Sequence, residues 1–470
     1  MTEPLWQLSA VELQRRFRER SLTPLAAAQA CLARLDAVNP KVNAVIARRD
    51  SAFLAEAQAA TRRHAQGKPL SGIDGVPLTV KDSLFTADQP TTWGTPALRD
   101  FTADHDETAV GRARAAGALL LGKTNVPEFA LEGYTANPLF GVTRNPWNPV
   151  LTPGGSSGGA VAAVACGMAP LAIGQDGGGS IRRPASHAGV VGLKPSLSAV
   201  PREHVLPSLL LDFEVIGPLT RSVADARLLF AVMRGPSPLD RSSLAAAHAA
   251  ATPRVAGPLR ILYVERFGSA PLDREIAASV GAAVEHLSAL GHRVEAGALP
   301  LDLGFYAEAW PQIGQIGLAR LFQQHPAWEA QASQKYRDMA EQGRRLSAPR
   351  LWQILEHVKQ LRRDTVPLFR HIDAIVLPSA AALPWTAEAA FPTHIDGQEV
   401  GPRGHAVYTG WVNAAGLPAL ALPCAPSREG LPIGMQVVGP YGSDDQLLDL
   451  GAAYEAAHPW AHRWPDLEHT

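Results

Sequence analysis

Apolar and polar positions follow two periods along the chain, and together they predict a succession of helices and strands. Residues 73–82 alternate between apolar and polar side chains, which is the period of a strand with one buried face. After Pro24, which follows the capping residue Thr23, apolar residues recur at helical spacing. The same analysis predicts helices at 50–66, 108–117, 160–165, 273–290 and 305–370, and a capped helix after Ser443. It predicts strands at 118–122, 190–195, 259–264, 374–377, 420–422 and 435–438. A turn is predicted at 123–125.

Predicted strands occur near both ends of the chain, and no clear boundary separates them into two groups. Helices and strands that alternate with short connections are typical of an α/β fold. We therefore expect one α/β domain over residues 1–470, with a large mixed sheet covered by helices. Within it, residues 235–258 are rich in Pro, Ser and Ala and should form a surface excursion, and residues 305–370 a helical insertion on the substrate side.

The stretch 145–180 carries the most distinctive pattern. Two Gly/Ser clusters, 154–159 and 177–180, flank a run of Ala and Val at 160–165. Such clusters usually mark flexible linkers, but a helix that is apolar on every face belongs in a core. Serines held on glycine turns at both ends of a buried element are candidates for catalysis, because glycines let backbone N–H groups approach a ligand closely.

Composition narrows the functional classes. The chain has 470 residues, 46% of them hydrophobic, and a formal net charge of −1, so we expect no nucleic-acid partner. No apolar run long enough to cross a bilayer escapes interruption by Gly or Pro, and the first residues lack a signal-peptide pattern. Cys31, Cys166 and Cys424 lie far apart and are expected to be buried free thiols. These features predict a soluble cytoplasmic protein without a membrane partner, either a monomer or a homodimer.

Lys81 stands at the end of the strand predicted over 73–82. If that strand is central, burial disfavours the ammonium and lowers its pKa from about 10.4. A neutral lysine is a competent general base, and a serine nucleophile requires one. Taken alone, Lys81 is more simply explained as a strand-end residue or a partner of Asp82, although neighbouring strand positions point to opposite faces.

Three motifs in this order resemble the amidase signature family: GVPLTVKD at 75–82, GGSSGG at 154–159 and DGGGSIR at 176–182. Flanking words resemble it as well, at 122–125, 143–148, 192–195, 217–220, 416–419 and 434–436. The resemblance covers essentially the whole chain, with the signature core at about 70–225. It implies a single α/β/α domain around a mixed sheet, and a Ser–Ser–Lys triad.

Matched by position, the resemblance implies that Ser180 is the nucleophile, Ser156 a bridging serine after a cis peptide bond, and Lys81 the base. The three side chains would form one hydrogen-bonded line at the bottom of a cleft. The resemblance also implies an oxyanion hole formed by the N–H groups of Gly177, Gly178, Gly179 and Ser180. Supporting hydrogen bonds are implied for Ser157, Asp176 and Arg182.

Three residues depart from the common family pattern. Gln175 stands where Ser or Thr is usual, and Gly177 where Thr or Ile is usual. Gly177 does not affect an oxyanion hole built from backbone groups, whereas the larger Gln175 leaves the hydrogen bonding near Asp176 open. His187 stands where a Phe, and sometimes a His, is usual, and we interpret it as structural.

A competing motif and a competing function stay open. Residues 155–159 also satisfy G-x-S-x-G, the nucleophile elbow of α/β-hydrolases, which would make Ser157 the nucleophile. That motif needs a strand directly before it, and the prolines at 146, 149 and 153 disfavour one. Some family members are the amidase component of a tRNA-dependent amidotransferase. Residues 305–350 do not resemble the Ser/Asn-rich stretch of that component, and no basic patch indicates tRNA.

The predicted activity is hydrolysis of a small carboxylic amide to an acid and an amine or ammonia. No metal-ligand spacing or phosphate loop occurs in the sequence, so no cofactor or metal is expected. Esters, anilides and carbamates are alternatives on the same triad. No basic residue is obviously placed to bind a substrate carboxylate, which favours a neutral, hydrophobic or aryl amide. Candidates for the pocket walls are Trp93, Phe129, Tyr134 and Gln175, together with Phe140 and Trp385.

Overall fold

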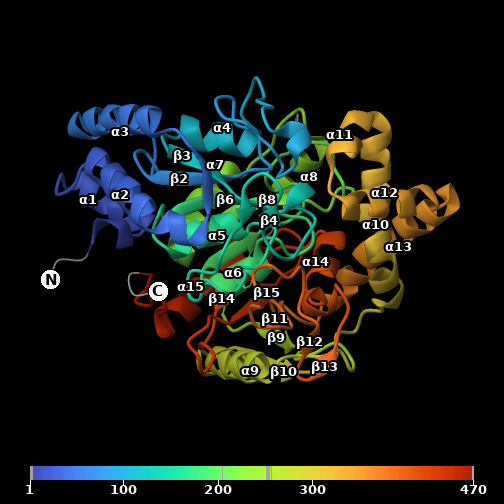
Figure 1. Cartoon of the computed structure of the whole chain (residues 1–470). Coiled ribbons are helices and arrows are strands. Elements are labelled where there is room, and N and C mark those ends of the chain that lie inside the picture. Colours follow the sequence, from blue (N-terminus) through green and yellow to red (C-terminus); the bar gives the residue numbers. More distant parts are fainter. Residues whose placement is uncertain (1–3, 204, 250–254, 256, 468–470) are drawn as a thin grey trace.

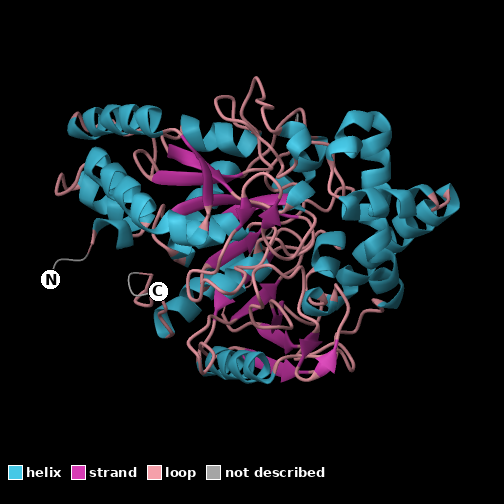
Figure 2. Ribbon diagram, in the orientation of Figure 1, coloured by secondary structure: helices cyan, strands magenta, loops and turns pink. Residues whose placement is uncertain are grey.

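An eleven-stranded sheet runs through the middle of the molecule and is flanked by helices (Figure 1, Figure 2). The computed structural model describes residues 4–203, 205–249, 255 and 257–467. From edge to edge the strands are β1 (Val45–Arg48), β3 (Leu119–Thr124), β2 (Pro77–Lys81), β6 (Leu171–Asp176), β8 (Val215–Thr220), β7 (Val191–Lys194), β14 (Ala419–Pro423), β15 (Gly434–Val438), β11 (Ala374–Pro378), β9 (Arg260–Tyr263) and β10 (Arg293–Ala296).

The sheet is mixed. β2 pairs in parallel with β3 and β6, and β9 pairs in parallel with β10 and β11. The other neighbouring strands are antiparallel. The predicted α/β/α domain with a mixed central sheet is therefore confirmed.

Helices gather at both ends of the sheet as well as over its faces. α1 (Ala10–Arg18), α2 (Pro24–Val42) and α3 (Asp50–Ala65) lie at the upper left of Figure 1, whereas α10 (Gly304–Gln324), α11 (Pro326–Gln331), α12 (Gln334–Arg344) and α13 (Ala348–Leu368) form an arm at the right. The other helices are α4 (Thr108–Ala115), α5 (Gly158–Ala165), α6 (Arg182–Ala188), α7 (Val223–Met233), α8 (Arg241–Ala249), α9 (Arg274–Ala289), α14 (Gly410–Ala414) and α15 (Asp444–Ala457), with short 3-10 turns at Leu5–Gln7, Pro96–Leu98, Glu128–Ala130 and Gly404–Ala406. Two small hairpins pair β4 (Ala136–Asn137) with β5 (Gly141–Val142) and β12 (His394–Ile395) with β13 (Gln398–Glu399).

Helices α5 and α6 are buried along their whole length. α5 consists only of Gly, Ala and Val, and these small side chains let its backbone approach the neighbouring chain closely. A Cβ on Gly159 would lie 2.4 Å from the backbone nitrogen of Asn125. The run of small residues at 160–165 is therefore a core helix, as predicted.

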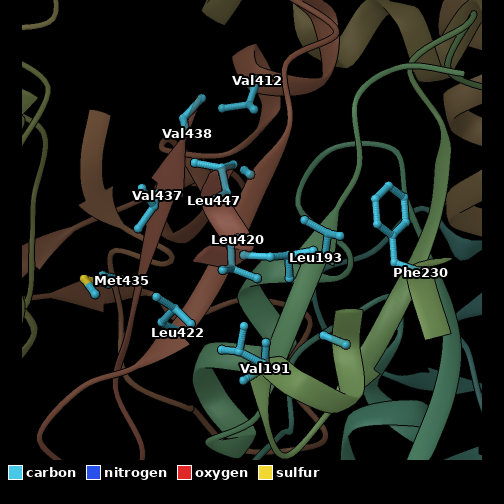
Figure 3. Packing of buried hydrophobic residues seen from close by; sticks show 14 of the residues in the cluster. Val191, Leu193, Phe230, Val412, Leu420, Leu422, Met435, Val437, Val438 and Leu447 are labelled. Atoms are coloured by element: carbon cyan, nitrogen blue, oxygen red, sulfur yellow. The ribbon is translucent and has the colours of Figure 1, made fainter. Parts of the chain in front are cut away.

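One part of the main core cluster lies where β7, β14 and β15 meet the helices (Figure 3). Leu193 and Leu420 approach each other from adjacent strands, and Leu447 of α15 and Val412 of α14 pack over this sheet region (Figure 3). β7 pairs with β8, which in turn pairs with β6, so this packing supports the sheet beside the strand that ends at Asp176.

Several local predictions hold and others are wrong. The side chain of Thr23 accepts a hydrogen bond from Ala26 N, as a helix cap does, but the Ser443 side chain makes no capping hydrogen bond at α15. Residues 123 and 124 continue β3 instead of forming a turn, because β2 pairs with β3 as far as the register of Lys81 with Thr124. The three cysteines are buried and free, as expected.

The predicted surface excursion at 235–258 contains a helix, α8, that the sequence analysis did not predict. Residues 250–254 and 256 of that segment lie outside the described residues. The predicted helical insertion at 305–370 corresponds to α10–α13, four helices in succession.

Gly217 gives a test of how tightly the sheet is packed. A Cβ at Gly217 would lie 2.0 Å from the Leu193 carbonyl oxygen, whereas a Cβ at Gly111 in α4 would meet nothing closer than 3.7 Å. We expect Gly217→Ala to lower the free energy of unfolding by about 1–3 kcal/mol. Gly111→Ala should raise it by up to about 1 kcal/mol, because Ala has the higher helix propensity. Urea titrations of both variants measure this, and an unchanged midpoint for Gly217→Ala would contradict the packing.

Candidate active site

The topology of the sheet brings two chemically important strand ends together. β2 and β6 are adjacent and parallel, so their carboxyl ends lie at the same edge of the sheet. Lys81 is the last residue of β2 and Asp176 is the last residue of β6. The Gly/Ser clusters 154–159 and 177–180 lead into the buried helices α5 and α6 at this edge.

The Lys81 amine is buried, with 1% of its surface exposed. Its Nζ donates to Ser156 Oγ at 2.8 Å and to the Gln175 carbonyl oxygen at 3.1 Å. Burial lowers the pKa of Lys81 to about 7, against the opposing attraction of Asp176. Asp82 does not compensate this amine. Its carboxylate accepts from Thr92 N at 3.2 Å and lies 3.7 Å from the Lys123 amine, so the predicted separation of Lys81 from Asp82 is confirmed.

The serines lie on two loops that touch. The Gly155–Ser156 peptide bond is cis, and Ser157 N donates to the Ser180 carbonyl oxygen at 3.2 Å. Ser157 Oγ donates to the Gln175 carbonyl at 3.2 Å, which leaves Ser156 as the serine that accepts from Lys81. Ser180 is the most exposed of the three serines, at 8% against 1% for Ser156 and 0% for Ser157.

The predicted hydrogen-bonded line is present in its first half. Lys81 and Ser156 are joined, but within the described chain the Ser180 hydroxyl makes no hydrogen bond to Ser156. The two hydroxyls lie on adjoining loops, whose backbones meet where Ser157 N donates to the Ser180 carbonyl.

The prediction that the Gly179 N–H belongs to the oxyanion hole is wrong. Gly179 N donates to Asp176 Oδ1 at 2.6 Å, so this N–H is not available to a ligand. In the part of the chain that the structure describes, the N–H groups of Gly178 and Ser180 have no acceptor. Gly179 has φ +115°, and a Cβ there would lie 2.2 Å from Thr409 Oγ1, so the loop requires glycine at this position.

A buried ion pair between Asp176 and Arg182 fixes the 177–180 loop. Arg182 Nε and Nη2 each donate to the Asp176 carboxylate at 3.1 Å, and Asn413 Nδ2 donates to it at 2.9 Å. Both charged side chains are fully buried. Burial by itself raises the pKa of Asp176, but the Arg182 charge and the donated hydrogen bonds outweigh it and hold that pKa well below its usual range. The supporting role expected for Asp176 and Arg182 fits this geometry.

Gln175 occupies a separate polar network. Its side chain accepts from Ser83 Oγ at 2.7 Å and donates to Glu214 at 2.9 Å, and Glu214 accepts from Arg202 at 2.7 Å. The Gln175 side chain therefore does not hydrogen-bond to Asp176. Its backbone carbonyl is the part that contacts Lys81 and Ser157.

Of the predicted pocket walls, Trp93 and Phe129 belong to the core instead. They are 4% and 1% exposed and pack edge to face with ring centroids 5.5 Å apart, within an aromatic cluster that includes Tyr336. Tyr134 is half-buried. Its backbone lies against the cis peptide bond, since a Cβ on Gly155 would lie 2.4 Å from the Tyr134 carbonyl oxygen.

The other aromatic candidates and His187 make contacts with other parts of the fold. Phe140 is half-buried in a hairpin turn and its carbonyl accepts from Asn43. Trp385 packs edge to face against His187, whose Nε2 lies 3.1 Å from the Ala382 carbonyl oxygen. These contacts fit the structural interpretation of His187.

Three residues that the sequence analysis missed lie directly against the 177–180 loop. Arg183 Nη1 and Thr409 Oγ1 both donate to the Gly178 carbonyl, at 2.5 and 2.8 Å. The Trp310 ring packs on Gly178, where a Cβ would lie 2.5 Å from it. A cavity of about 420 Å³ is lined by Trp310, Arg403 and apolar side chains of 299–303. Thr409 and Trp310 come from distant segments without a motif. Arg183 follows the motif directly, so its charge was the available signal.

Comparison with known proteins identifies the family. The sequence profile named Amidase matches residues 26–448. The chain belongs to the amidase signature family. It is 34% identical to the A subunit of the glutamyl-tRNA(Gln) amidotransferase of Roseiflexus castenholzii, over 99% of this chain and 98% of that protein. It is 33% identical to the indoleacetamide hydrolase of Bradyrhizobium diazoefficiens, over 99% of this chain and 90% of that protein.

Solved structures of the family agree with this fold over their full lengths. A bacterial aryl acylamidase of the amidase signature family matches with a TM-score of 0.88 at 28% identity, covering 98% of both chains. A 6-aminohexanoate cyclic dimer hydrolase, solved in complex with its substrate, matches with a TM-score of 0.88 at 29% identity, covering 99% of this chain and 100% of that chain. The protein is thus an amidase signature amidohydrolase.

Two structural features are absent from the described residues. Within these ranges, no helix is both long and apolar enough to cross a membrane. The same ranges contain no group of three His, Cys, Asp or Glu side chains that could hold a metal ion.

The Asp176–Arg182 pair predicts a large stability effect. Arg182→Met leaves the buried carboxylate uncompensated, so we expect a loss of roughly 3–5 kcal/mol in the free energy of unfolding at neutral pH. The loss should shrink as pH falls below about 4, because the pKa of Asp176 is depressed in the native state and its stabilisation disappears as it is protonated. Urea titrations at neutral and acidic pH measure both effects.

The matched control is Arg344→Met in the exposed pair with Glu329. It should change stability by no more than about 1 kcal/mol, because exposed ion pairs contribute little. Equal losses for the two variants would contradict the bracing role of the buried pair.

Proposed function

We propose that the protein hydrolyses a small-molecule carboxylic amide through an acyl-enzyme on Ser180, with Lys81 as the base acting through Ser156. The observation that carries this proposal is the buried Lys81 amine donating to Ser156 Oγ at 2.8 Å, beside the loop of Ser180. With a pKa of about 7, a large fraction of Lys81 is neutral at neutral pH and can accept a proton.

The proton path follows from these contacts. Ser180 Oγ attacks the substrate carbonyl carbon as its proton passes to Ser156 and the Ser156 proton passes to Lys81. Rotation of the Ser180 hydroxyl toward Ser156 completes this relay, since unliganded sites often have loose catalytic hydrogen bonds. The C–N bond then breaks and the leaving nitrogen takes the proton back through Ser156. Water cleaves the acyl-enzyme by the same route and releases the acid.

The unoccupied backbone donors support a place for the developing negative charge. The N–H groups of Gly178 and Ser180, with Gly177 beside them, would stabilise the tetrahedral oxyanion. Esters, anilides and carbamates form a similar oxyanion, so the same groups would serve them. The proposal uses no cofactor and no metal.

A second candidate is the role named for several relatives, which are components of a tRNA-dependent amidotransferase. The indoleacetamide hydrolase and the aryl acylamidase match over similar shares of the chain. We favour autonomous hydrolysis, because residues 305–350 lack the Ser/Asn-rich character of the amidotransferase component.

Single substitutions test the triad. Ser180→Ala, Ser156→Ala and Lys81→Ala should each lower kcat for an aryl amide on the order of 10³-fold or more, because each removes a member of the proton path. The chain purified alone should be the active species. Hydrolysis that appears only with partner proteins and tRNA would favour the amidotransferase role.

Ser157→Ala is the matched control for the nucleophile. It removes a hydroxyl that only donates to the Gln175 carbonyl, so a smaller loss is expected. Complete loss in Ser157→Ala with activity retained in Ser180→Ala would favour the nucleophile elbow instead.

The pH dependence tests the identity of the base. Activity should rise with pH through about 7, the pKa of Lys81, because only the neutral amine accepts a proton. We expect an optimum at about pH 7.5 to 9. Burial lowers the pKa of His187 to about 4, so His187→Ala should leave the limb near 7 in place. A limb at about 6.5 that disappears in His187→Ala would identify a histidine base.

A further inference from the structure

Arg183 is a buried cation without a counter-ion. It is 5% exposed, and its Nη1 donates to the Gly178 carbonyl at 2.5 Å and to Thr409 Oγ1 at 2.9 Å. Its buried Nε has no hydrogen-bond partner among the described residues, and no carboxylate of those residues forms an ion pair with it. A buried charge without a partner is costly, so its presence here needs a reason.

His405 adds unused hydrogen-bonding capacity on the same side of the site. It is 4% exposed, and neither ring nitrogen has a partner within the described ranges. The His405 ring packs on Gly133, where a Cβ would lie 2.3 Å from His405 Nε2. Gly133 directly precedes Tyr134, whose backbone lies against the cis peptide bond. Burial and the nearby charges of Arg183 and Arg403 hold the pKa of His405 well below its usual range. The neutral ring keeps one N–H to donate.

Arg403 extends the positive charge into the neighbouring cavity. Its guanidinium lies 5.2 Å from the centroid of the Trp310 ring, and Trp310 packs on Gly178. Arg403 forms no ion pair with any described carboxylate, and no acidic residue lines this cavity of about 420 Å³.

The carboxylates near these groups are already engaged. Asp176 is held by Arg182 and Asn413, and Glu132 pairs with Lys335 at 3.1 Å. Fixing the loop does not explain the charge of Arg183 either, because Thr409 Oγ1 already donates to the Gly178 carbonyl at 2.8 Å. The site therefore presents positive charge and free donors that the protein itself does not satisfy.

We propose that Arg183, assisted by His405 and Arg403, binds a carboxylate of the substrate, so that the preferred substrate is an amide carrying a negatively charged group. This inference rests on the proposed function, since it assigns the substrate class of the same site. It replaces the neutral substrate expected from the sequence, whose premise was that no basic residue is placed to bind a carboxylate. A guanidinium suits this role because its planar fork matches carboxylate geometry.

Matched substrate pairs test the proposal with the purified full chain. The first pair is the mono-para-nitroanilide of adipic acid and hexanoyl para-nitroanilide, which differ in the acyl half. The second pair is para-acetamidobenzoate and para-acetamidotoluene, which differ in the amine half. We expect kcat/KM to favour the carboxylate at least about tenfold in one pair, equivalent to about 1.4 kcal/mol. The pair that shows the preference identifies the half of the substrate that Arg183 contacts.

Variants then connect the preference to the residues. Arg183→Gln keeps a donor but removes the charge, so it should lower kcat/KM for the carboxylate substrate at least about tenfold more than for its neutral partner, mainly through KM. Arg403→Gln should reduce the preference in the same direction. Arg350→Gln makes the same charge change in α13, where the guanidinium pairs with Glu308, and should leave the preference unchanged.

Each other outcome separates the two proposals. Equal kcat/KM values within both pairs in the wild-type enzyme, with hydrolysis that depends on Ser180, would overturn the carboxylate site and leave the proposed function standing. A preference that persists in both Arg183→Gln and Arg403→Gln would also overturn it. An Arg183→Gln variant that loses both substrates equally would show that the arginine acts only on the loop or the oxyanion. Hydrolysis retained in Ser180→Ala would contradict the proposed function itself.

Discussion

The Asp176–Arg182 ion pair is the interaction on which the site depends. Asp176 ends a strand in the middle of the sheet, and its carboxylate accepts from Gly179 N and Ile181 N as well as from Arg182. Arg182 in turn donates to the Asn413 side chain and to Gln436 on β15 at 2.9 Å. The loop that carries Ser180 is thereby tied to two distant parts of the chain, α14 and β15. Because the side-chain N–H donors of Arg182 are all used, this network restricts the conformation of the loop.

The same pair also shapes the environment of Lys81. An unpaired carboxylate at the end of β6 would attract the Lys81 ammonium strongly and keep its pKa high. In the structure the attraction of Asp176 opposes the effect of burial on Lys81. Desolvation is then the larger effect on Lys81, and its pKa falls to about 7. Asp176 therefore acts both on the loop of Ser180 and on the pKa of the proposed base.

Much of the fold and of the serine–lysine site could be predicted from the sequence, because the patterns that indicate them lie within short stretches of the chain. Neighbouring residues alone indicate the strand at 77–81 and the apolar helix α5. The same holds for the turns at the glycine clusters. Four of the eleven strands of the main sheet were missed. The edge strands β1 and β10 are four residues long and partly exposed, so neither shows a continuous apolar pattern. The central strands β6 and β8 are buried at every position, so neither shows the alternation of a half-buried strand. The oxyanion role assigned to Gly179 failed for another reason. Its N–H partner is a side chain three residues earlier, and motif position does not reveal hydrogen-bond direction.

Contacts from distant segments could not be predicted in the same way. Trp310 and Thr409 reach the Ser180 loop from residues more than a hundred positions away, and nothing in their local sequence indicates that destination. Trp93 and Phe129 show the converse difficulty. Their aromatic character suits a pocket wall as well as a core, and only the packing of Phe322 and Tyr336 against Phe129 decides for the core.

Lys81 and Arg183 are both buried at this site, but they differ in protonation state at neutral pH. The residue type explains this difference. Burial lowers the pKa of Lys81 to about 7 and that of Arg183, with help from the Arg403 charge, to about 9. At neutral pH the lysine is therefore largely free to give up its proton, whereas the arginine stays charged. A guanidinium spreads its charge over three nitrogens and starts from a much higher pKa, so comparable desolvation does not discharge it. Exchanging the two residue types would leave a charged group where the proposed mechanism needs a base, and a neutral amine where we propose that a substrate carboxylate binds.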